Sequence, residues 1–190
     1  MNHQGNWKRK LEEASTQIKT GYAQIGRKTG AAHLAIIYPP EVETAVFKEW
    51  QSITAGLGTE FEIKIIDILA VTMGLIDEIG CQEIIDTITR PMPGSDPKSE
   101  LGQMWLQAIL DQVQTVTSQT CNSRQVIVLQ YLAALYPATT PRALMQKMWE
   151  NERFSVDCPI IFFIPGTLTQ KRVYSFVNTS EELMYRGDIL

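Results

Sequence analysis

The chain has 190 residues, of which 44% are hydrophobic and 20% are charged, as is usual for a folded globular protein and not for a disordered one. Its net charge of −4 argues against a protein whose main partner is the phosphate backbone of a nucleic acid. At this length one core can bury enough surface without disulfides or metals. We therefore expect a single domain over residues 1–190.

The cysteines and the first residues favour the cytoplasm. Cys81, Cys121 and Cys158 lie far apart, which is typical of free thiols in a reducing compartment and not of a disulfide framework or a zinc site. The first ten residues lack the apolar core of a signal peptide, and the longest apolar runs are much shorter than the ~20 residues that cross a bilayer. We expect a cytoplasmic protein that binds no membrane.

The first predicted element is an amphipathic helix within residues 1–30. Its apolar positions recur every three or four residues, and the segment carries six basic and two acidic residues. Two interpretations stay open: a solvated basic face on a helix packed against the core, or an arm that docks onto an acidic partner or nucleic acid. We favour the first, because few aromatic residues interleave with the basic ones, and we do not expect direct nucleic-acid binding.

Strands and helices alternate along the rest of the chain. The apolar runs predict strands at 34–38, 61–66, 126–129 and 160–164, with a final edge strand at 173–177. Helical spacing predicts helices at 41–57, 68–89 (broken at Gly80), 99–118 and from Thr140–Pro141 onward. Residues 90–98 hold three prolines and form a surface loop.

This alternation predicts an α/β fold, with a mostly parallel sheet of about four to five strands and helices on both faces. Ligands of such sheets bind in a crevice at the carboxyl ends of the strands. The candidate crevice residues are Tyr38, Asp67, Pro165, Gly166 and Thr167.

The layering resembles that of P-loop and Rossmann proteins, but no nucleotide-binding loop is recognisable. Gly21–Thr29 nearly matches G-x-x-x-x-G-K-[ST], with one extra residue, and it follows a helix instead of a strand. The first strand is followed by Pro39-Pro40, not by the glycines of a dinucleotide site. We therefore expect no cofactor.

Three side chains could carry chemistry, and each has a structural interpretation that we favour. His33 is a candidate base but precedes the first strand, opposite the predicted crevice, where a solvated or hydrogen-bonded imidazole is the simpler interpretation. Cys158 is a candidate nucleophile but enters an apolar strand, where a buried thiol is usual. Asp67 closes the second strand and is more simply the cap of the next helix. We predict no catalytic or metal-binding residue.

The aromatic–cation pair near the carboxyl terminus has two open interpretations: a contact with another protein, since such residues are enriched at interfaces, or a terminal strand docked on the fold. The candidate partner-binding residues, which we expect at the surface, are Tyr174, Phe176, Tyr185 and Arg186.

Several of these segments resemble the BrxB family of bacterial BREX phage-defence systems. The resemblance lies in the segment 159–167, the aromatic strand at Tyr174-Ser175-Phe176 and the pair Tyr185-Arg186. The segments 34–40 and 65–69 are similar to the family's first two strands, and the order of elements agrees over about residues 7–190.

The resemblance implies a non-enzymatic adaptor or scaffold of a defence assembly. It implies a PglZ-like phosphatase-fold protein as partner, alongside an ATPase and a DNA methyltransferase. The alternative is an α/β enzyme that binds a small ligand or nucleotide in the crevice, with Asp67 or Thr167 as polar groups.

Overall fold

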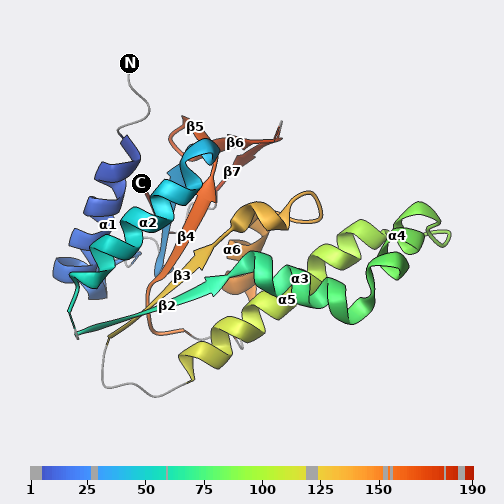
Figure 1. Ribbon diagram of the computed structural model, residues 1–190, viewed down its shortest axis with the longest axis horizontal. Coiled ribbons are helices and arrows are strands. Elements are labelled where there is room, and N and C mark those ends of the chain that lie inside the picture. The colour runs from blue at the N-terminus through green and yellow to red at the C-terminus, as the bar shows by residue number, and fades with distance from the viewer. Residues whose placement is uncertain are drawn as a thin grey trace.

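A five-stranded parallel sheet forms the centre of the computed structural model (Figure 1), which describes residues 6–26, 30–58, 60–118, 124–151, 154, 156–177, 179–183 and 187–190. The strand order is β2-β3-β4-β1-β8, and each neighbouring pair is parallel. The strands are β1 (His33–Tyr38), β2 (Phe61–Asp67), β3 (Arg124–Gln130), β4 (Ile160–Pro165) and β8 (Asp188–Ile189). The predicted α/β class is confirmed.

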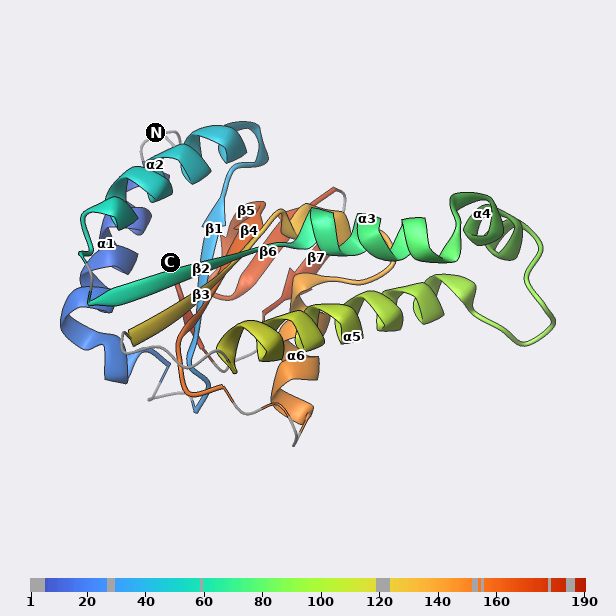
Figure 2. The ribbon, with the colours of Figure 1, turned by 60° about the horizontal axis from the view of Figure 1, so that its bottom comes forward.

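Two helices cover one face of this sheet, α1 (Asn6–Gly21) and α2 (Glu43–Ala55) (Figure 2). Trp7, Leu11 and Ile18 of α1 are buried together with Trp50 of α2 against the side chains of β1, β3 and β4. The predicted amphipathic helix therefore packs on the core and does not form an arm. It ends at Gly21, before a short 3-10 turn, η2 (Tyr22–Gln24), and another such turn, η3 (Pro40–Val42), precedes α2.

The other face is covered by α5 (Pro97–Thr117), α6 (Pro141–Glu150), the 3-10 turn η4 (Leu132–Leu135) and the start of α3 (Ile68–Ile79). Leu106, Ile109 and Val113 of α5 meet alternate side chains of the central strands β3 and β4. The central strands are buried along both faces, which explains their nearly continuous apolar sequence.

The segment predicted as a final edge strand, 173–177, does contain a strand, but the prediction that it belongs to the main sheet is wrong. Residues Val173–Phe176 form β6, the middle strand of a separate antiparallel sheet with β5 (Thr167–Gln170) and β7 (Thr179–Glu182). Strands this close in sequence pair through short hairpins, whereas a parallel pairing needs a long crossover. The fifth strand of the main sheet is instead β8, where Leu190 exchanges backbone hydrogen bonds with Ala35 and Ile37 of β1.

Helix boundaries agree with the remaining predictions, apart from small shifts. Gly80, at φ 99°, separates α3 from α4 (Cys81–Thr89), as the predicted break requires. The Thr140 hydroxyl accepts a hydrogen bond from the Ala143 N–H at 3.2 Å and caps α6. The Pro-rich loop is shorter than predicted, because Asp96 caps α5 and Pro97 is already helical.

Candidate functional site

The structure gathers only part of the predicted crevice. Tyr38 and Pro165 pair at the ends of β1 and β4, and the Gly166 N–H donates to the Tyr38 carbonyl at 2.8 Å. Thr167 follows in an exposed position on β5. Asp67 ends β2, which is separated from β1 by β3 and β4, and so it lies apart from the other four.

Aromatic side chains fill the end of the sheet near Tyr38. Its hydroxyl donates to Glu43 Oε2 at 2.6 Å, and its side chain is buried. Burial, reinforced by this hydrogen bond to Glu43, raises the pKa of the Tyr38 phenol well above its usual value. Phe47 packs against Tyr38, Phe163 and Tyr131 with ring centroids 4.8–6.0 Å apart. Tyr38 is therefore part of the core at the carboxyl ends of the strands.

Asp67 has the structural role that the sequence favoured. Its Oδ1 accepts a hydrogen bond from the Ala70 N–H at 2.9 Å, which caps α3.

His33 and Cys158 lie at the opposite end of the central strands, where β1 and β4 begin, in the lining of a cavity of about 190 Å³. Burial lowers the pKa of the His33 imidazole to about 4, and its ring packs edge-on against Phe162. Burial also raises the pKa of the Cys158 thiol to about 11. A neutral imidazole and a protonated thiol are the forms expected of core residues. Burial was the sequence interpretation of Cys158, whereas for His33 it was a solvated or hydrogen-bonded imidazole.

The expectation that Tyr174 lies at the surface is wrong, because its side chain is only 1% exposed. Its hydroxyl lies 2.6 Å from the Tyr136 hydroxyl and donates to Glu181 Oε2 at 2.9 Å. Phe176 is half-buried and packs on Tyr136, with ring centroids 5.0 Å apart. Tyr185 and Arg186 lie outside the residues that the structure describes.

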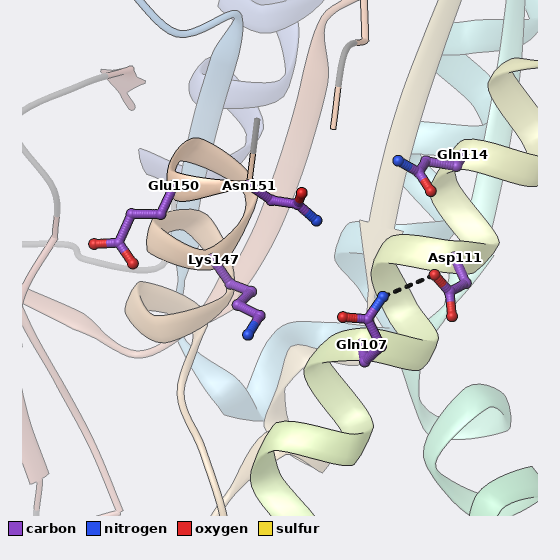
Figure 3. A pocket seen from close by; sticks show the side chains of 6 residues that line it. All are labelled: Gln107, Asp111, Gln114, Lys147, Glu150 and Asn151. Carbon is purple, nitrogen blue, oxygen red and sulfur yellow. Dashed lines mark hydrogen bonds between the residues drawn. The ribbon is translucent and has the colours of Figure 1, made fainter. Parts of the chain in front are cut away.

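An open polar groove of about 550 Å³ lies between α5 and α6 (Figure 3). Gln107 Nε2 donates to Asp111 Oδ1 at 2.9 Å on one side, and Lys147 lies across the groove on α6. The other lining residues are Gln114, Glu150 and Asn151. These side chains are exposed or half-buried and carry both signs of charge, as is usual for two solvated helix faces.

The feature that sequence reasoning missed is a helical arm, which we define as residues 73–104. Both α3 and α5 extend beyond the sheet and contact each other, with α4 at the tip (Figure 2). Every residue from Met73 to Leu101 is exposed or half-buried, so this stretch contributes no fully buried side chain to either core. Helices in globular proteins normally bury one apolar face, and α4 buries none.

Large apolar side chains are concentrated on this arm and at its base. Of the ten that are well exposed among the described residues, seven lie here, and Met92 is 75% exposed. Ile85 and Ile88 of α4 are 47% and 44% exposed. The remaining four are Met73 and Met104 on the arm, and Ile65 of β2 and Leu69 of the first turn of α3 at its base. Such a concentration of exposed large apolar side chains on one part of the chain is typical of a site of interaction.

A small cavity of about 120 Å³ lies between the end of α3, α4 and the start of α5, and we name it the tip groove. Its apolar lining residues are Ile79, Ile84, Ile88, Pro97, Leu101 and Met104, and its polar ones are Glu83, Thr87 and Glu100. The sequence did carry a signal for it: the isoleucines at 84, 85 and 88 have helical spacing in the second part of the predicted helix, but spacing alone does not show what covers them.

No family model, curated protein or solved structure matches this chain. Within the described ranges, no helix combines the length and apolar character needed to span a bilayer. The same residues include no group of three or more His, Cys, Asp or Glu side chains placed to hold a metal ion.

Proposed function

We propose that this chain is a non-catalytic adaptor that binds another protein through its helical arm. The observation that carries this proposal is the arm itself, with exposed Ile85, Ile88 and Met92 and no fully buried side chain from Met73 to Leu101. Burial of apolar surface is the main favourable term in protein association, at roughly 25 cal/mol per Å² before the costs of binding. A partner that covers the arm would bury the apolar side chains that the fold of this chain leaves exposed.

The assembly that we propose is a cytoplasmic defence complex of the BREX type, with a PglZ-like protein as the direct partner. This part rests on the resemblance of the segments 34–40, 65–69 and 159–167 to the BrxB family. The arm supports a protein partner in general, and the resemblance supports this particular one.

The enzyme alternative has less support from the geometry. Its polar groups do not converge, because Asp67 caps α3 on one edge strand while Thr167 lies on the small sheet beyond β4. A thermal-shift panel of ATP, GTP and Mg²⁺ tests it directly, since a ligand that binds the folded state raises the melting temperature.

Affinity capture from the native host tests the adaptor proposal. The variant Ile85→Gln/Ile88→Gln removes apolar side chains from α4 without changing the net charge. A matched control, Leu168→Gln/Val177→Gln, removes two exposed apolar side chains on or beside the small sheet, away from the arm.

We expect the wild type and the control to retain a PglZ-like protein, an ATPase or a methyltransferase, identified by mass spectrometry. The arm variant should lose it with an unchanged melting temperature. Equal recovery with the arm variant would contradict the role of the arm, and recovery of the chain alone by the wild type would contradict the adaptor proposal.

A further inference from the structure

We propose that the tip groove binds an amphipathic helix of a partner protein whose apolar face is flanked by Lys or Arg. This inference rests on the proposed adaptor function and adds the chemistry of the segment that is recognised.

The apolar part of the groove selects an apolar side chain. Its apolar lining comes from all three helices: Ile84 and Ile88 of α4, Leu101 and Met104 of α5, and Ile79 of α3. Its volume of about 120 Å³ suits one large aliphatic side chain. Side chains of this kind recur at i, i+3 and i+4 on an amphipathic helix, the usual ligand of such grooves.

The arrangement of the arm favours a helix over an extended peptide. Three helices, α3, α4 and α5, supply the lining of the tip groove, and an amphipathic helix is the usual ligand of an apolar groove between helices (Figure 2). Met104 of α5 lines the groove and Met73 of α3 lies outside its lining, and both are 45% exposed. Methionine is adaptable enough to pack against differing side chains.

The charges around the groove select basic flanks. Glu83 and Glu100 line it, and within the described residues neither carboxylate is paired with a cation. Residues 73–104 carry six acidic and two basic side chains. The basic ones are Arg90 and Lys98, so a net charge of −4 remains to be complemented by a partner.

A second copy of this chain is a poorer occupant. Its own arm carries the same negative charge, and like charges brought together across an interface oppose association. Its most basic helix, α1, already buries Trp7, Leu11 and Ile18 on the sheet and has no free apolar face to offer.

Two synthetic amphipathic peptides test the inference with the full chain. Both have the same leucine face, and one is flanked by lysines and the other by glutamates. Fluorescence anisotropy measures their affinity at low and high salt. We expect the lysine peptide to bind at least about tenfold more tightly than the glutamate peptide, and the difference to shrink as salt screens the charges.

A charge variant of the groove, Glu83→Gln/Glu100→Gln, should weaken the lysine peptide about tenfold and leave the melting temperature unchanged. The matched control, Glu12→Gln/Glu13→Gln, removes two exposed carboxylates from α1 and should bind as the wild type does. Ile88→Gln should weaken both peptides.

Three results would overturn the inference: binding of neither peptide, equal binding of both, or a reversible dimer in sedimentation that Ile85→Gln/Ile88→Gln abolishes. If the native partner still depends on Ile85 and Ile88 while both peptides bind equally, the adaptor proposal stands and only the basic helix is refuted. If the charge-selective binding is seen but no native partner is captured, the adaptor proposal fails instead.

Discussion

Asp67 Oδ1 accepts a hydrogen bond from the Ala70 N–H at 2.9 Å, at the residue where β2 ends and α3 begins. This bond satisfies one of the backbone N–H groups that the first turn of a helix leaves free. It also sets the point from which the arm leaves the sheet, since α3 continues without interruption to Ile79. Asp67, which we predicted in the crevice, thus stabilises the start of the helix that leads into the arm.

Replacing Asp67 by Ala should destabilise the protein by about 1 kcal/mol, the usual loss for a side-chain cap. Urea denaturation followed by circular dichroism measures this as a lower midpoint with an unchanged slope. Asp67→Asn keeps an acceptor oxygen and should lose much less. An unchanged midpoint for Asp67→Ala would show that the cap contributes nothing.

Gly102 and Gly74 form a matched pair of helical glycines. A Cβ at Gly102 would lie 2.5 Å from the Ala138 carbonyl oxygen, whereas a Cβ at Gly74 meets nothing within 4 Å. We expect Gly102→Ala to lower the free energy of unfolding by about 1–3 kcal/mol through overpacking. Gly74→Ala should raise it by about 0.5–1 kcal/mol, because alanine favours the helix. Changes of equal sign would contradict the packing of α5 against residue 138.

His33 should make the stability depend on pH in mildly acidic solution. Burial lowers its pKa from the usual 6.5 to about 4, so between these values the unfolded chain binds a proton that the folded chain does not. Its stabilising contribution is complete above about pH 6.5 and is lost as the pH falls to about 4, by about 3 kcal/mol at most. Denaturation midpoints across this range measure the loss.

The variant His33→Phe cannot titrate there and should show a flatter profile than the wild type. A His3→Gln protein keeps His33 as its single imidazole, so NMR can measure the pKa of His33 directly. This measurement does not depend on how well His33→Phe folds. An NMR pKa near 6.5 would contradict the buried environment of His33.

Tyr174 should matter for stability and not for partner binding. Tyr174→Phe leaves the Tyr136 hydroxyl and the Glu181 carboxylate each without one hydrogen bond. We expect a loss of about 1–3 kcal/mol in the free energy of unfolding. Affinity capture should recover the same partners as the wild type. Loss of a partner at full stability would show that Tyr174 contacts it after all.

Local patterns predicted the central sheet because its strands are buried on both faces and their apolar runs stand out. The runs at 34–38 and 160–164 correspond to β1 and β4, and turn chemistry placed the caps at Asp67 and Thr140. The same pattern failed for Tyr174, since an aromatic residue beside polar ones fits both a core position and an interface.

The sequence by itself determined the α/β class, the break at Gly80 and the structural roles of Cys158 and Asp67, because each follows from the periodicity, turn residues or side-chain chemistry of a short segment. The burial of His33 came from the tertiary structure. Only the tertiary structure decided that β8 completes the sheet and that β6 belongs to another one, since strand pairing joins residues far apart in the chain. It also decided that the isoleucines of α4 face no core. Helical spacing shows which residues share a face, but what covers that face depends on how far the helix extends beyond the sheet.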